Sequence, residues 1–190
     1  MKKRAALGTA VLICCVVFFS GSAFAGGTLK IGIDSGGQLT NTVSGTNVSA
    51  TEDVNGSASL AMEGFGELNK NFDLGGGIEF QMPREMTKYT GKFNFVPMYL
   101  MMRLHPEISD LTPYLTAQLG FAIFNGDTNF KGNLTLTPGG HVGIGVGVIL
   151  DKNFLFEFLA TVDTGGAEYN GEEVFKVSYS KVTLSVGINF

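Results

Sequence analysis

The sequence contains no tryptophan and only two cysteines, Cys14 and Cys15, both within the first 25 residues. The chain beyond them therefore has no disulfide bond and no thiol chemistry. Basic residues are also scarce there, since ten lysines and arginines stand against seventeen acidic residues, which gives a formal charge of −7. This balance argues against nucleic acid as a partner, because nucleic-acid binding favours a basic surface.

Long apolar runs are absent as well. Beyond residue 25 no stretch approaches the roughly 18 apolar residues of a transmembrane helix. A membrane-spanning structure built from this part of the chain must therefore be a closed β-barrel. The 165 residues that remain are too few for a channel-forming barrel of about 16 strands.

The N-terminus has the pattern of a secretory signal peptide. Met1-Lys2-Lys3-Arg4 is positively charged, residues 5–19 are apolar, and Ala23-Phe24-Ala25 places small residues at positions −3 and −1. We therefore predict cleavage before Gly26, with a signal peptide at 1–25 and one domain at 26–190. The alternatives are a retained anchor, for which the apolar run is short, and a lipoprotein site at Cys14, where the preceding Ile13 is too large.

Alternation of apolar and small polar residues is the main pattern in the remaining chain. The last nine residues show it without a break, since Val182, Leu184, Val186, Ile188 and Phe190 share one face of a predicted strand. Similar alternation predicts eight strands in all, at residues 27–38, 57–69, 72–82, 92–104, 113–124, 140–150, 154–162 and 174–190.

The predicted connections alternate between long and short, and this predicts an orientation. Long loops are expected at 39–56, 83–91, 125–139 and 163–173, and shorter ones at 70–71, 105–112 and 151–153. Barrels of this kind keep their short turns in the periplasm, so we expect both termini there and the long loops outside. The first and last strands then pair to close the barrel.

Two local features disagree with regular strands. Pro97 lies in the middle of the fourth strand and cannot donate a ladder hydrogen bond, so we expect a bulge or a missing bond there. In the eighth strand the apolar side chains of Phe175, Val177 and Tyr179 occupy the opposite parity from Val182 onward. This switch predicts a second bulge, or immersion of the final segment alone.

The chain from residue 26 resembles the small eight-stranded outer-membrane barrel domains of the OmpA/OmpX type. Residues 95–103, Phe-Val-Pro-Met-Tyr-Leu-Met-Met-Arg, and Thr112-Pro113-Tyr114-Leu115 resemble the fourth and fifth strands of that family. The terminal Phe190 resembles the signal read by the barrel-assembly machinery. The resemblance implies an all-β, eight-stranded antiparallel up-and-down transmembrane β-barrel. The chain departs from the family in lacking tryptophan, so Phe and Tyr must form the aromatic girdles.

Most charged residues of the predicted strands lie on the face that is expected to point into the lumen. In a narrow eight-stranded barrel these side chains are expected to form ion pairs that plug the lumen, although acids outnumber bases and a narrow ion path is the alternative. The predicted lumen network consists of Lys30, Glu63, Glu67, Glu79, Arg103 and Glu157. Three alternating glycines, Gly143, Gly145 and Gly147, are expected to leave room for large side chains from other strands.

The sequence offers little for catalysis or for metal binding. The histidines, His105 and His141, fall at opposite ends of the predicted barrel, so no metal site is expected. Barrel enzymes that deacylate lipopolysaccharide use a His and a Ser two residues apart, but Gly143 occupies that position after His141. Acidic residues of the outer loops could bind divalent cations, although a solvated surface is the simpler interpretation: Asp127, Asp163, Glu168, Glu172 and Glu173.

These patterns predict a non-enzymatic protein of the Gram-negative cell envelope, exported by the Sec pathway to the outer membrane, without a cofactor. We expect a structural or surface-interaction role, with a narrow channel and a lipid-modifying enzyme as alternatives. The expected partners are outer-membrane lipid, lipopolysaccharide and, during insertion, the barrel-assembly machinery, and we expect a monomer. A secreted lipocalin-like binder with inverted faces would expose Glu63, Glu79, Arg103 and Glu157 and crowd large apolar side chains into a narrow cavity.

Overall fold

The computed structural model describes residues 26–88, 90–106 and 109–190, so the predicted signal peptide, 1–25, lies outside the described residues. Most of the described chain forms β-strands. Its elements are β1 (Gly26–Asp34), β2 (Gln38–Val43), β3 (Ser49–Asp53), β4 (Ser57–Asn69), β5 (Phe72–Gln81), β6 (Arg84–Glu85), β7 (Lys92–Leu104), β8 (Leu111–Gly126), α2 (Thr128–Lys131), β9 (Thr135–Leu150), β10 (Phe154–Tyr169) and β11 (Glu172–Asn189).

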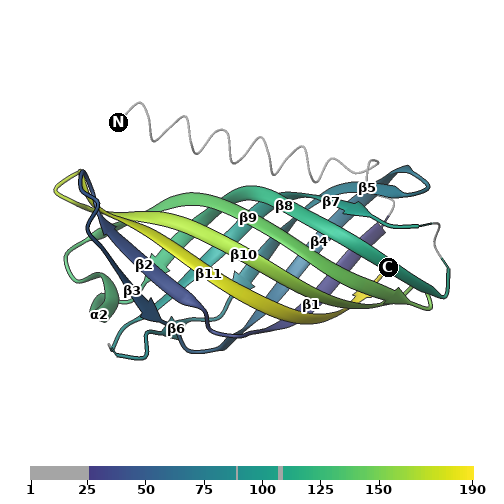
Figure 1. Cartoon of the computed structure of the whole chain (residues 1–190), viewed down its shortest axis with the longest axis horizontal. Helices are drawn as coiled ribbons and strands as arrows, with labels where there is room; N and C mark the ends of the chain where they lie inside the picture. The colour runs from purple at the N-terminus through teal and green to yellow at the C-terminus, as the bar shows by residue number, and fades with distance from the viewer. Residues whose placement is uncertain (1–25, 89, 107–108) are drawn as a thin grey trace.

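Eight of these strands form a closed antiparallel barrel. Each pairs with its neighbour in the order β1, β4, β5, β7, β8, β9, β10 and β11, and β11 pairs again with β1, with Ile31 opposite Val186. Figure 1 shows the tilted strands and places β2, β3, β6 and α2 at the end opposite the C-terminus. We call the end that contains Gly26 and Phe190 the turn end and the opposite end the loop end. The eight-stranded up-and-down topology predicted from the sequence is confirmed.

Three neighbouring strands are interrupted at one level near the loop end. β1 continues into β2 after residues 35–37, where Gly36 and Gly37 have φ values of +92° and +100° that favour glycine. β3 likewise leads into β4, and β5 leads into β6. Above the interruption β2 pairs with both β11 and β3, and a bridge from Val54 to Met86 connects β3 to the β6 region. The wall of the barrel therefore continues where the sequence predicted a loop at 39–56.

The outward face of the barrel is apolar. On β11, Leu184, Val186 and Ile188 are 59%, 50% and 47% exposed, whereas Thr183 and Ser185 point inward and are buried. The other barrel strands repeat this arrangement, which is the inverse of a soluble barrel and suits contact with hydrocarbon. Among the described residues, no helix is long and apolar enough to cross a membrane.

The missing hydrogen bond expected at Pro97 is found between β7 and β5. Pairing between these strands ends at Met98, opposite Ile78, and β7 pairs again with β6 only at Phe93. Pairing of β7 with β8 on the other side passes through Pro97 without a register shift. The proline thus faces a gap in the ladder, where it costs no bond.

The bulge predicted in the last strand is not found, whereas the alternative, immersion of the final segment alone, agrees with the polar outward residues Lys176, Ser178 and Ser180. The pairing of β10 with β11 shows no register shift between Phe175 and Val182, and inward-facing residues keep odd numbers throughout. Val177 and Tyr179 are apolar because they face a buried apolar cluster inside the loop end. The change in pattern therefore marks a change in what fills the barrel, with no change in strand geometry.

Substitution of an outward residue tests the assignment of this face to lipid. We expect Leu184→Arg to destabilise the barrel by about 2–4 kcal/mol, because a guanidinium near the middle of the bilayer loses its hydration. Refolding yield in lipid vesicles, followed by the gel mobility of unboiled samples, measures this effect, and Leu184→Met is the control. Equal yields for the two variants would show that Leu184 does not contact hydrocarbon.

Candidate functional site

The turn-end half of the lumen contains a charge cluster centred on Lys30. The Lys30 ammonium lies 2.6 Å from Glu63 Oε1 and 2.7 Å from Glu157 Oε1, and all three side chains are buried. Tyr99 donates a hydrogen bond to Glu63 at 2.9 Å, and Tyr114 donates one to Glu157 at 3.0 Å. Five strands, β1, β4, β7, β8 and β10, thus contribute to one polar cluster that crosses the lumen.

Arg103 adds a second positive charge to this cluster. Its Nη2 atom lies 3.5 Å from Glu63 Oε2, and its guanidinium lies over the rings of Phe65 and Tyr114, at 4.9 and 4.7 Å from their centroids. Tyr114 can extend across the lumen because the facing residue is Gly147, where a Cβ atom would collide with the phenol ring. This glycine therefore makes room for a large side chain, as predicted.

A second charge cluster lies closer to the loop end. Lys181 Nζ lies 2.5 Å from Glu79 Oε1 and 2.9 Å from Asp34 Oδ1, and Arg84 Nη2 lies 2.7 Å from Asp34 Oδ2. Thr183 also donates a hydrogen bond to Asp34 at 2.6 Å. These residues lie beside the interruption of β1 and β5, so their ion pairs join the segments on either side of it.

A third polar group in the lumen is centred on a buried histidine, His141. His141 Nδ1 lies 2.6 Å from Asp163 Oδ1, and its Nε2 lies 3.1 Å from Gln118 Oε1. Gln81 donates a hydrogen bond to the other oxygen of Asp163 at 2.9 Å, and the Tyr99 ring stacks on the imidazole at 5.2 Å. The sequence placed Asp163 in an outer loop, but β10 extends beyond residue 162, where the strand was predicted to end. Asp163 therefore lies on β10 and faces the lumen.

Apolar side chains fill the lumen at the loop end. Phe95 stacks on Phe124 with ring centroids 4.5 Å apart and lies nearly parallel to Tyr179 at 6.1 Å. Phe93 meets these rings edge to face, and Phe130 from α2 packs against them. We call this group the aromatic layer; its buried members are Leu39, Val54, Phe93, Phe95, Ala122, Phe124, Val177 and Tyr179.

The buried carboxylates of the lumen lie beside basic side chains. Among the described residues, six carboxylates are buried with four lysine or arginine side chains and two histidines. Four of the carboxylates contact a lysine or arginine, whereas Asp163 contacts His141 and Asp73 lies 3.3 Å from His105 Nε2. The excess of acid that the sequence indicated is reduced by Arg84 and Lys181. Each buried carboxylate thus has a basic neighbour, as burial of charge requires.

Most of the predicted network residues lie inside the barrel. Lys30, Glu63, Arg103 and Glu157 belong to the turn-end cluster, and Glu79 belongs to the second one. Glu67 is the exception, because it is exposed near the end of β4. The main chain of Phe190 exchanges hydrogen bonds with Gly27, at 2.8 and 2.9 Å, while its side chain remains 78% exposed.

Three members of the second charge cluster and the role of the buried histidine were not predicted from the sequence. Arg84 was expected in a loop. Lys181 was not assigned to the lumen because a bulge was expected beside it. Asp34 lies on the predicted lumen face of the first strand, but no ion pair was predicted for it. One signal was available, because odd parity carried through residues 177–189 places Lys181 on the same side as Thr183 and Ser185.

Both histidine side chains are buried and have polar neighbours. Both ring nitrogens of His141 have partners, and the side chain faces the lumen with no exposed surface. His105 is buried at the turn end, where its Nδ1 lies 2.7 Å from the carbonyl oxygen of Pro106. Among the described residues, no group of three or more His, Cys, Asp or Glu side chains is placed to hold a metal ion.

Comparison with known proteins gives matches in structure only. No family model and no curated protein sequence matches. The crystal structure of the outer membrane protein OprG from Pseudomonas aeruginosa matches with a TM-score of 0.52 and 13% identity over 89% of this chain and 98% of that chain. Neisserial surface protein A matches with a TM-score of 0.49 and 12% identity over 90% of this chain and 100% of that chain.

The outer membrane protein AlkL, solved in DMPC lipid bilayers, matches with a TM-score of 0.48 and 11% identity over 90% of this chain and 93% of that chain. The match to OprG shows a shared fold, and at 13% identity it shows no shared activity. The strand order, the apolar outer face and the match to OprG lead to the same conclusion. The chain has the fold of the small eight-stranded outer-membrane β-barrels.

Proposed function

We propose that the protein is a non-enzymatic, non-conducting outer-membrane barrel that presents a rigid β-structured extension at the cell surface. The occupied lumen is the observation that supports a non-conducting barrel. Two charge clusters, the His141 group and the aromatic layer all occupy the lumen, and each joins side chains from non-adjacent strands. A hydrated ion would have to break several of these contacts to pass.

The extension at the loop end supports a role at the surface. β10 and β11 pair as far as Tyr169 and Glu172, and the β2–β3 hairpin pairs with β11. The outward residues of this region are polar, as on β11 at Lys176 and Ser178. A paired extension holds its shape better than a free loop, so it suits a structural or surface-interaction role in the cell envelope.

The orientation and the partners belong to the same proposal. The turn end, with Gly26 and Phe190, lies in the periplasm after Sec export and cleavage before Gly26, and the loop end lies outside. Phe190 has a free side chain beside the last strand pair, where the barrel-assembly machinery can bind it during insertion. The inserted barrel is a monomer in contact with outer-membrane lipid and lipopolysaccharide.

Gel mobility and conductance test this function. We expect protein extracted from envelopes to migrate differently before and after boiling, because a closed barrel resists detergent. The same preparation is expected to give no conductance steps in planar bilayers, with a channel-forming porin as the positive control. Reproducible steps would contradict a plugged lumen and favour the narrow channel, and recovery of the protein in the soluble periplasm would contradict the membrane location.

A further inference from the structure

Some polar atoms deep in the lumen have no hydrogen-bond partner in the protein. Among the described residues, these atoms include the guanidinium nitrogens of Arg103, the hydroxyl of Thr116, the side-chain nitrogen of Gln118 and the hydroxyl of Thr161. All four side chains are buried, with at most 3% of their surface exposed. Since a buried polar atom without a partner is unfavourable and rare in native proteins, these atoms indicate a bound ligand.

The four residues form two pairs. Arg103 on β7 is the cross-strand partner of Thr116 on β8, so the two side chains lie next to one another on the lumen wall. Gln118 on β8 and Thr161 on β10 are both cross-strand partners of Gly143 on β9. A Cβ atom on Gly143 would lie 2.9 Å from Gln118 Oε1 and 3.2 Å from Thr161 Cγ2, so both side chains reach the space over this glycine. We call the two places the Arg103 site and the Gln118 site.

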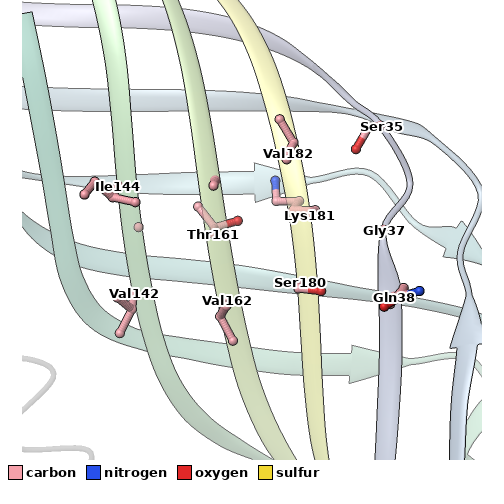
Figure 2. A pocket seen from close by; sticks show the side chains of 12 residues that line it. Ser35, Gly37, Gln38, Val142, Ile144, Thr161, Val162, Ser180, Lys181 and Val182 are labelled. Carbon is pink, nitrogen blue, oxygen red and sulfur yellow. The ribbon is translucent and has the colours of Figure 1, made fainter.

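The known contacts of the Gln118 site do not satisfy its side chains. Gln118 Oε1 lies 3.1 Å from His141 Nε2, so reversal of the amide would only exchange which of its two polar atoms lacks a partner. Figure 2 shows Thr161 beside Lys181, its partner on the neighbouring strand. The Lys181 ammonium contacts two carboxylates, at 2.9 and 2.5 Å, so its charge is already compensated. The site therefore has polar atoms to satisfy and no unbalanced charge.

The charges around the Arg103 site also favour a neutral ligand. Arg103 Nη2 lies 3.5 Å from Glu63 Oε2, and Lys30 contacts Glu63 and Glu157, so two basic groups here face two carboxylates. An anion would place a further negative charge near Glu63, and a cation would face the guanidinium. The ligand must also accept from N–H groups and bond to hydroxyls. Water is the smallest molecule that does both.

We propose that each site binds one ordered water molecule. At the Arg103 site the water accepts a hydrogen bond from the guanidinium and bonds to the Thr116 hydroxyl, and at the Gln118 site it accepts from the amide and bonds to the Thr161 hydroxyl. Two polar partners are enough to hold a buried water. The waters connect β7 to β8 and β8 to β10, so they are part of the plug, and this inference rests on the plugged lumen of the proposed function.

Removal of one hydroxyl tests each site through the sign of its effect. Thr116→Val and Thr161→Val keep the shape of the side chain but take a partner from the water, so we expect the equilibrium constant for unfolding in lipid vesicles to rise about fivefold to tenfold. Without a water, the same changes would remove a buried unpaired hydroxyl and lower that constant. Thr183→Val, which loses the 2.6 Å hydrogen bond to Asp34, is the reference for loss of a known bond. An unchanged or lower constant in a valine variant would overturn the water at that site.

Nuclear magnetic resonance in lipid bilayers detects the water directly. We expect magnetisation transfer from water to the Gln118 side-chain amide, and loss of this transfer in Gly143→Ala, whose methyl group fills the space over the glycine. Gly140→Ala on the same strand is the matched control, because its Cβ atom would meet nothing closer than 3.5 Å. The gel shift on boiling shows that each variant has folded. Equal transfer in the two alanine variants would overturn the Gln118 site, whereas conductance steps from unaltered protein would instead contradict the proposed function.

Discussion

Replacement of Lys30 by methionine is expected to lower the free energy of unfolding by about 3–5 kcal/mol. The ammonium of Lys30 contacts Glu63 and Glu157 at 2.6 and 2.7 Å, and neither carboxylate reaches solvent. Without Lys30 two negative charges remain buried, where they repel one another and have lost their hydration. The hydrogen bonds from Tyr99 and Tyr114 remain, but neutral donors compensate only part of a buried charge.

Denaturant unfolding in lipid vesicles measures this loss, and two further variants interpret it. Lys92→Met breaks an exposed ion pair with Glu85 at 3.4 Å, so it is expected to cost no more than about 1 kcal/mol. The double variant Lys30→Met with Glu157→Gln removes one orphaned charge and is expected to recover part of the stability. A loss in Lys30→Met as small as that in Lys92→Met would show that the lumen is hydrated.

The sequence predicted the barrel because period-two alternation is imposed directly by the bilayer. Wherever lipid meets the outer wall, outward residues must be apolar, and so the predicted strands at 57–69 and 92–104 coincide with β4 and β7. Beyond the bilayer this constraint ends. One strand was therefore predicted to begin at residue 140, although β9 begins at Thr135, and the next was predicted to end at residue 162, although β10 ends at Tyr169. The β2–β3 hairpin was assigned to a loop for the same reason.

Lumen residues such as Lys30 and Glu157 could be predicted because they are charged and alternate with apolar residues of the outward face. The residues that fill the lumen at the loop end could not be predicted, because the interior was assumed to be polar throughout. Phe93, Phe95 and Tyr179 face inward because the loop end is packed like a protein core, and parity alone cannot distinguish an apolar interior from an apolar exterior. For the same reason Lys181 was not assigned to the lumen: Val177 and Tyr179 share its face of the strand, and their apolar side chains indicated that this face contacts lipid.

Removal of two rings from the aromatic layer is expected to admit water-soluble reagents into the lumen from the loop end. Phe95 and Phe124 stack at 4.5 Å and are buried, so each change to alanine costs about 3–5 kcal/mol and leaves a cavity. The chain from residue 26 has no cysteine, so Thr161→Cys, buried in the lumen, provides a single reporter thiol. Its labelling by a small charged thiol reagent, added from the loop-end side of vesicles, is expected to accelerate about tenfold or more, because the reagent no longer waits for the layer to open.

The double variant Phe156→Ala with Phe158→Ala is the control, since both rings face outward and are 44% and 52% exposed. It removes the same atoms without opening the lumen, so labelling is expected to stay slow. The gel shift on boiling selects folded protein, and Phe95→Ala alone replaces the double variant if that fails to fold. Rapid labelling of Thr161→Cys with the aromatic layer intact would show that this layer does not seal the barrel. The charge clusters and the His141 group would then form the barrier to ions, and the conductance of the unaltered protein would depend on Lys30 and Lys181.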